Sequence, residues 1–171
     1  MMKRQTRMRI ALAGSAVVLA AGLSGCSVIS NILGGSQDAP RDDQSGAVTQ
    51  SSNIDIFSLK VGDCKMADGS NSQVSDTDVV PCTDPHDEEV FYEFKMPDGT
   101  FDSTAVDTAA EQCYGQPFTD FVGVASDAST LEVYYLAPTQ QTWDKLNDRL
   151  VQCIITDPAG KTTGSLKGAA R

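Results

Sequence analysis

His86 is the first candidate for chemistry, because an imidazole can change its charge near neutral pH. It is the single histidine in the chain of 171 residues. Four carboxylates surround it: Asp84, Asp87, Glu88 and Glu89. An imidazole among carboxylates can bind a metal ion or transfer a proton. However, the sequence offers no second histidine at a metal-ligand spacing and no recognisable nucleophile–base pair. We therefore expect a structural role, in which Pro85 and His86 shape the entry into the next strand and the imidazole hydrogen-bonds a nearby carboxylate.

Trp143, Asp148 and Arg149 form a second candidate cluster. Such a cluster can recognise a polar partner, but an arginine more often packs its stem on an indole and pairs with an acid. We expect this second arrangement, with Asp63 as the acid. The residues retained as candidates for an interaction with a partner are His86, Asp87, Glu89, Trp143 and Arg149.

The sequence contains no pattern for a catalytic, metal or cofactor site. Asp76, Asp78, Asp84 and Asp87 lack the spacing of a calcium-binding loop, so we expect a solvated acidic face. There is no Gly-x-Ser-x-Gly motif, phosphate-binding loop or dinucleotide fingerprint. We expect neither an enzyme nor a cofactor, and a pI near 4.3 argues against nucleic-acid binding.

The N-terminus has the pattern of an export signal. Four cations without an acid precede fourteen uncharged residues, 10–23, which is shorter than a membrane-spanning helix needs. The following Leu23-Ser24-Gly25-Cys26 closely resembles the lipobox of bacterial lipoproteins. The resemblance implies that residues 1–25 are a signal peptide and that Cys26 carries lipid chains, palmitate among them, which anchor the protein in the cell membrane on its extracytoplasmic face.

Residues 26–53 are expected to be a lipidated cysteine followed by a disordered tether, because Gly, Ser, Gln and Asp dominate and apolar residues are not periodic. Removal of residues 1–25 leaves 9 Lys and Arg against 23 Asp and Glu. Anionic lipid headgroups repel such a surface, so the domain at 54–171 should stand away from the membrane.

The folded domain is predicted to be α+β, with a small, mainly antiparallel sheet and one main helix packed on it. Strands are expected at 57–61, 78–82, 89–96, 131–137 and 150–155, and Val90, Tyr92 and Phe94 should share one face. The main helix should begin at a capping box of Thr104 and Asp107 and end at Gly115 and Pro117. A short helical turn should follow around Phe118, and another short helix should span 139–146.

Four cysteines remain after lipidation: Cys64, Cys82, Cys113 and Cys153. An even number in a small exported domain indicates disulfides, and four cysteines allow three pairings. We favour Cys64–Cys82, which joins neighbouring strands, and Cys113–Cys153, which joins the apolar stripe of the helix to the inward face of the last strand.

Several segments together resemble the septum-formation family of actinobacterial cell-envelope proteins. They are Val61–Cys64, Val80–Cys82, Pro85–Asp87, Glu89–Phe91, Cys113, Pro138, Trp143, Asp148-Arg149, Cys153 and Gly164–Leu166. The similarity covers residues 57–168, and Cys82 to Val90 is its most specific part. The chain has Asn147 where the family pattern tends to have Gly, but Asn also tolerates left-handed geometry. The resemblance implies a link to cell division but no defined reaction.

These observations lead us to expect a non-enzymatic, membrane-anchored lipoprotein that presents an interaction domain to a cell-envelope protein, and the resemblance implies an association with septum formation. The alternative is an extracytoplasmic module that binds a small molecule or an envelope fragment. A secreted hydrolase is the third hypothesis. A deep apolar pocket would favour ligand capture, whereas a flat exposed patch would favour a protein partner.

Overall fold

The computed structural model describes residues 38–69 and 74–171. The predicted signal peptide, Cys26 and the first part of the predicted tether lie outside these residues. Within the two described ranges, no helix is long and apolar enough to cross a membrane.

Six antiparallel strands form one open sheet in the order β1-β3-β2-β4-β6-β5. The strands are β1 (Ser52–Asp55), β2 (Cys64–Lys65), β3 (Asp76–Val80), β4 (Glu88–Lys95), β5 (Glu132–Leu136) and β6 (Leu150–Thr156). The α-helices are α1 (Ser103–Ala110), α2 (Gln116–Val122) and α3 (Gln140–Leu146). Short 3-10 turns are η2 (Ile56–Ser58), η3 (Glu111–Tyr114) and η4 (Ser126–Ala128). The predicted α+β class with an antiparallel sheet and one main helical layer is confirmed.

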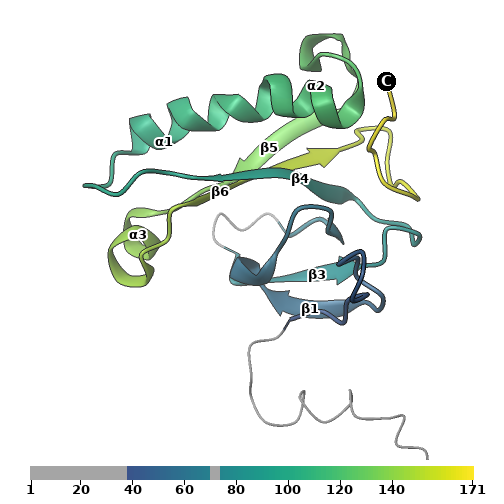
Figure 1. Ribbon diagram of the computed structural model, residues 1–171, viewed down its shortest axis with the longest axis horizontal. Coiled ribbons are helices and arrows are strands. Elements are labelled where there is room, and N and C mark those ends of the chain that lie inside the picture. The colour runs from purple at the N-terminus through teal and green to yellow at the C-terminus, as the bar shows by residue number, and fades with distance from the viewer. Residues whose placement is uncertain (1–37, 70–73) are drawn as a thin grey trace, which may run out of the picture. The chain divides into compact units, whose positions relative to one another are not determined.

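The helical layer of α1, η3 and α2 covers one face of strands β4, β6 and β5 (Figure 1). Val106, Ala110 and Cys113 are buried, which confirms the predicted stripe. Asp102 caps α1 by accepting from the main-chain N–H groups of Thr104 and Ala105, so the predicted cap at Thr104 is wrong by two residues. Gly115 ends η3 as predicted, but Pro117 lies in the first turn of α2, where its missing N–H costs nothing.

Two hydrophobic cores lie on opposite faces of the sheet. The upper core, under the helices, consists of Phe91, Cys113, Phe118, Val122, Leu131, Cys153, Ile155 and Leu166. The lower core joins β1 and β3 to the other face of β4 and β6 and consists of Ala39, Val48, Ile54, Leu59, Val79, Val90 and Ile154. Figure 1 shows β1 and β3 below β4 and β6, on the side away from α1 and α2.

A β-bulge in β4 divides its side chains between these cores. The register with β6 shifts between Val90 and Tyr92, so that Phe91 is the extra residue. Val90 packs in the lower core, whereas Phe91, Tyr92 and Phe94 pack in or against the upper core. The prediction that Val90 shares a face with Tyr92 and Phe94 is therefore wrong, because a bulge interrupts the alternation that it assumed.

Residues 38–53, for which the sequence predicts a disordered tether, are instead packed on the domain. Ala39 and Val48 are buried in the lower core, and Arg41 forms an isolated bridge with Val48. Asp42 accepts hydrogen bonds from the main-chain N–H groups of Gln44 and Ser45, which closes a turn between these residues. The polar composition of this segment therefore reflects turn chemistry and not disorder.

The first strand also lies elsewhere than predicted. Residues 57 and 58 belong to the 3-10 turn η2, while the strand is β1, five residues earlier. The carboxylate of Asp55 accepts from the Phe57 N–H and starts this turn. The other predicted strands and the helix at 139–146 are confirmed with shifts of a few residues at their ends.

Both predicted disulfides are confirmed. Cys64–Cys82 joins β2 to the second residue after β3, and Cys113–Cys153 joins η3 to β6. Sequence separations of 18 and 40 residues make them worth about 3 and about 4 kcal/mol by loop-closure entropy.

We predict that the double substitution Cys113→Ala, Cys153→Ala lowers the free energy of unfolding by about 4 kcal/mol, because it frees the longer loop. The matched Cys64→Ala, Cys82→Ala variant should lose about 3 kcal/mol. Urea denaturation followed by tryptophan fluorescence measures both losses. Equal stability of the three proteins would show that the crosslinks do not stabilise the fold.

Candidate functional site

His86 is fully buried at the start of β4, and hydrogen bonds occupy both of its ring nitrogens. Its Nδ1 lies 2.8 Å from the carbonyl oxygen of Asp84, so Nδ1 donates, and Nε2 lies 3.1 Å from the hydroxyl of Thr162. The main chains of His86 and Thr162 also exchange two hydrogen bonds. The residue therefore ties the C-terminal segment to β4. It bonds a carbonyl and a hydroxyl and not the carboxylate that the sequence predicted.

Glu89 is a buried carboxylate with two hydrogen-bond donors. Its oxygens accept from the Ser165 hydroxyl at 2.6 Å and from the Leu166 N–H at 2.7 Å. Burial raises its pKa, and these two hydrogen bonds partly oppose that effect. The carboxylate also lies within 4.8 Å of the sulfurs of Cys64 and Cys82, but the disulfide between them leaves no thiolate to bind a metal.

Asp87, just before β4, has different hydrogen-bond partners from Glu89. It accepts from the Ala67 N–H at 3.0 Å and from the Lys161 ammonium at 2.9 Å. The hydrogen bond from Ala67 lowers its pKa most, burial opposes this shift, and the hydrogen bond and charge of Lys161 lower the pKa further. This partly exposed pair is a surface contact between β4 and the chain after β6.

Trp143 and Arg149 form the second predicted cluster. The Arg149 guanidinium carbon lies 3.7 Å from the centre of the indole, and its Nε is 3.5 Å from an oxygen of the exposed Asp98. The predicted packing on the indole is confirmed, but the predicted partner Asp63 is wrong. Asp63 instead pairs with Arg41 at 2.5 and 2.8 Å. Arg41 lies in the segment for which the sequence predicts a disordered tether, and such a segment gives no reason to expect a fixed ion pair.

The α3 helix that carries Trp143 ends at Asn147 in the left-handed conformation, with φ of 53°. Asn147 therefore adopts the left-handed geometry that an Asn at this position was expected to tolerate. Thr139 and Thr142 form a capping box at the other end of the helix.

The two predicted clusters do not form one site. His86, Asp87 and Glu89 lie near the start of β4. Arg149 lies near the other end of this strand, because it directly precedes Leu150, which pairs with Lys95. At about 3.3 Å per residue, these ends of the strand are roughly 20 Å apart.

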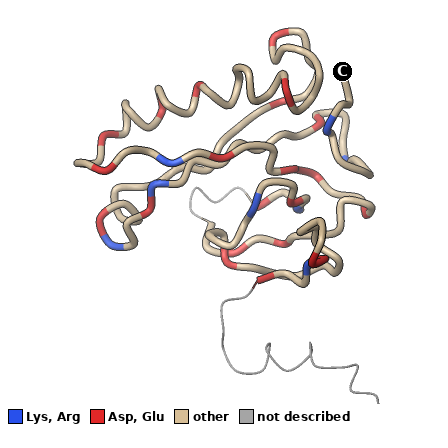
Figure 2. The backbone as a smooth tube through the Cα atoms, in the orientation of Figure 1, with Lys and Arg blue, Asp and Glu red and all other residues tan. Residues whose placement is uncertain are grey.

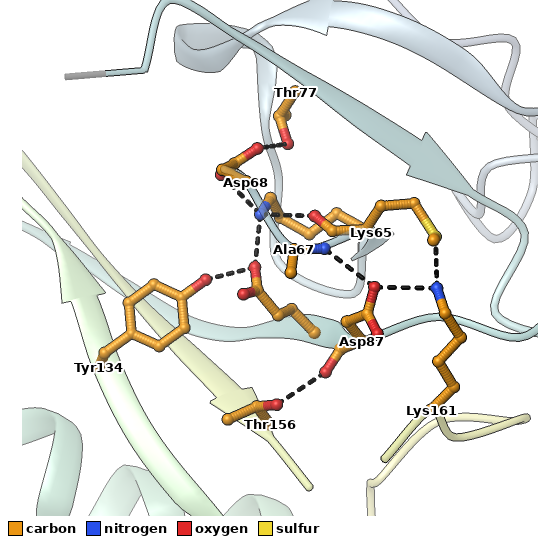
Figure 3. A network of polar contacts seen from close by, with 10 residues as sticks. Lys65, Ala67, Asp68, Thr77, Asp87, Tyr134, Thr156 and Lys161 are labelled. Atoms are coloured by element: carbon orange, nitrogen blue, oxygen red, sulfur yellow. Dashed lines mark hydrogen bonds and ion pairs between the residues drawn. The ribbon is translucent and has the colours of Figure 1, made fainter. Parts of the chain in front are cut away.

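A charged network that the sequence did not predict lies at the same end of β4 as His86, with Lys65 at its centre (Figure 3). The Lys65 side chain is fully buried, and its ammonium donates to Met66 O at 3.0 Å, to Asp68 at 2.7 Å and to Glu88 Oε2. The same Glu88 oxygen accepts from the Tyr134 hydroxyl. The three N–H bonds of the ammonium are thus all used, which is the condition for burying such a charge.

This network forms the base of an open cleft of about 600 Å³. The cleft lies on the sheet face opposite α1 and α2 and extends from Glu88 and Tyr134 to Asp148. Its apolar walls come from η2, β5 and β6: Ile56, Phe57, Leu136 and Leu150. This size lies within the range of known ligand pockets.

The charges around the cleft are mainly acidic, but acids are not confined to it. Figure 2 shows Asp and Glu distributed over the helical layer and the lower strands alike. Asp76 and Asp78 are exposed on β3, which fits the predicted solvated face. Burial, together with the Glu88 carboxylate, raises the pKa of Tyr134 far above its ordinary value, so its hydroxyl remains a donor.

The sequence offered little to identify Lys65 and Tyr134. A single Lys between Cys64 and Met66 has the pattern of an exposed strand residue, and Tyr134 of an ordinary strand aromatic. Only the folding of β2 onto β4 brings Lys65 beside Glu88.

The family model described as septum formation matches residues 61–171. This chain belongs to the septum-formation family. The match begins just before β2 and therefore includes Lys65, Glu88, Tyr134 and most of the cleft wall. No match was found among curated proteins or among solved structures.

We predict that Lys65→Met in this septum-formation domain lowers the free energy of unfolding by about 3 kcal/mol, because Glu88 and Asp68 then remain near each other without a cation. The control is Lys161→Met, since Lys161 is 44% exposed and pairs with Asp87 at the surface. That variant should lose less than about 1 kcal/mol. Urea denaturation at neutral pH measures both, and equal losses would contradict the structural importance of the network.

A second prediction concerns the pH dependence that Glu89 contributes. Its folded-state pKa is raised, so between the unfolded value of about 4.3 and the folded value the folded state keeps a proton that the unfolded state has released. This contribution makes the wild type less stable as pH rises. The difference in unfolding free energy, Glu89→Gln minus wild type, should therefore increase from about pH 4 upward and level off above the folded pKa. Parallel stability curves for the two proteins would show that burial does not shift this carboxyl.

Proposed function

We propose that this chain is a lipoprotein anchored through Cys26 to the outer face of the cytoplasmic membrane, where it serves septum formation as a non-enzymatic interaction module. The family description supplies the link to septum formation. The charge pattern of residues 1–25 and the lipobox at 23–26 support the anchor. The segment between Cys26 and Asp38 would separate the lipid from the domain.

The observation that carries the non-enzymatic part is the position of His86. A general base must reach the proton that it abstracts, but this imidazole is buried and both of its nitrogens already have partners. Glu89, the described carboxyl with a raised pKa, is likewise buried and bonded to the C-terminal segment. Neither group is placed to act on a substrate.

A second candidate function is the binding of a small molecule or an envelope fragment. The cleft of about 600 Å³ favours it, because its apolar walls and its polar base are the usual composition of a ligand site. Both functions would use the same surface, and both are compatible with septum formation.

The anchored interaction module predicts a result in the cell. We would place a photo-reactive residue at the exposed Gln141, beside the cleft, in the wild type and in a Cys26→Ser variant. The wild type should sediment with membranes and crosslink to the same envelope proteins in repeated experiments. The variant cannot be acylated, so most of it should leave the membrane fraction, and those crosslinks should weaken at least about tenfold as its local concentration falls.

The two halves of the proposal fail separately in this experiment. A Cys26→Ser protein that stays with the membranes would contradict lipid anchoring. A wild type that sediments with membranes but yields no reproducible crosslink would contradict the interaction module and favour capture of a small molecule.

A further inference from the structure

The strand β5 is an open edge of the sheet. Within residues 38–69 and 74–171, the sheet ends with β5, which pairs only with β6. None of its residues, Glu132–Leu136, is fully buried, whereas five of the seven residues in β6 are. Edge strands in natural proteins are usually protected by lysine, proline, bulges or a covering segment, because their free main-chain groups can pair with another chain.

The main-chain direction of β5 follows from the hydrogen bonds of β6. Met96 N donates to Arg149 O, so Arg149 and every second residue after it direct their main-chain groups to β4. Leu150, Gln152 and Ile154 therefore direct theirs to β5.

The register then identifies the free groups. Tyr134 lies opposite Ile154 and bonds to β6, so Val133 and Tyr135 point their N–H and C=O groups to the free edge. The Tyr114 hydroxyl donates to Val133 O, as expected for an outward carbonyl. Among the described residues, no group bonds the main-chain N–H or C=O of Tyr135.

The open edge borders the cleft. The residues from Tyr134 to Ala137 line it, and the side chains of Tyr134 and Leu136 face the lower side of the sheet, where the cleft lies. Phe57, which also lines the cleft, is 51% exposed. A chain that paired with β5 would send every second side chain into this cleft.

The charges that line the cleft favour a cationic ligand. All its charged lining residues are acids: Asp68, Glu88 and Asp148. Lys65 pairs with both Asp68 and Glu88, and its ammonium has no donor left for a ligand. Both hydrogen bonds of Glu88 are to Oε2, so Oε1 has no hydrogen-bond partner among the described residues.

We propose that β5 and this cleft bind an extended peptide segment with basic and apolar side chains, which adds to the sheet as a further strand. Main-chain hydrogen bonds to Tyr135 hold the segment, its apolar side chain packs against Phe57 and Leu136, and its cations approach the acids of the cleft. The inference rests on the proposed interaction function and specifies its partner: a protein with an accessible, extended basic segment.

The test uses the full-length chain purified in detergent and the peptide acetyl-Thr-Lys-Thr-Val-Thr-Lys-Thr-amide. NMR titration should shift the amide signals of residues 133–137 and slow the hydrogen exchange of the Tyr135 amide. The counterpart with Glu in place of Lys should bind at least about tenfold more weakly, because the acids of the cleft repel it.

Two substitutions of exposed apolar residues provide a matched comparison. Phe57→Ala should weaken binding of the lysine peptide by about fivefold, because it removes an apolar wall of the cleft. Leu146 is 61% exposed on α3 and does not line the cleft, so Leu146→Ala should leave the affinity within about twofold. Neither side chain is buried, so both variants should fold.

Each other outcome overturns the inference. Equal binding of the two peptides, shifts away from β5 or no binding at about 1 mM would exclude this site for a basic segment. Binding in the cleft without protection of the Tyr135 amide would exclude strand addition and favour a small ligand. Since the measurement is made in detergent, its result is independent of whether Cys26→Ser leaves the membrane in cells.

Discussion

The bond between Cys113 and Cys153 is the constraint on which the domain most depends. It fastens the helical layer to β6, the strand that lies between β4 and β5 and supplies residues to both cores. With the helices held on the upper face, the lower face of the same strands is left to β1, β3 and the N-terminal turn. These short elements cover only part of that face, and the uncovered part is the cleft.

The buried charges depend on that arrangement. Lys65 lies on a strand of only two residues, and it is held between Glu88 of β4 and Asp68 of the chain that follows. An ammonium group away from water is stable only while all its acceptors stay in place. The network therefore requires β2 to remain paired with both of its neighbours, to which the disulfide at Cys64 contributes. The buried Asp63, just before β2, depends in the same way on its pair with Arg41.

The elements with a simple periodic pattern were predictable from the sequence. The stripe from Val106 to Cys113 has the period of a helix, and the alternation in β6 identified Cys153 as inward; together they gave the correct disulfide pairing. The errors have physical causes that no local pattern reveals. Asp42 and Gly46 close a turn whose composition is that of a disordered segment. Asp63, the predicted partner of Arg149, pairs with Arg41 from this segment instead. The cleft depends on β2, β4 and β5 meeting in space, which is a property of the topology.

The extra residue at Phe91 has a consequence for how the two cores are connected. In a regular strand Val90, Tyr92 and Phe94 would project to the same side, so all three would pack in one core. The bulge shifts the alternation of side chains by one residue. Val90 before it therefore packs in the lower core, and Tyr92 and Phe94 after it pack against the upper core. Insertions or deletions elsewhere in β4 would upset this phase, whereas the loss of Phe91 alone would restore a regular strand and keep both halves in step. The aromatic contacts of Phe91 with Phe118 and Phe121 are then what distinguishes the bent strand from the straight one.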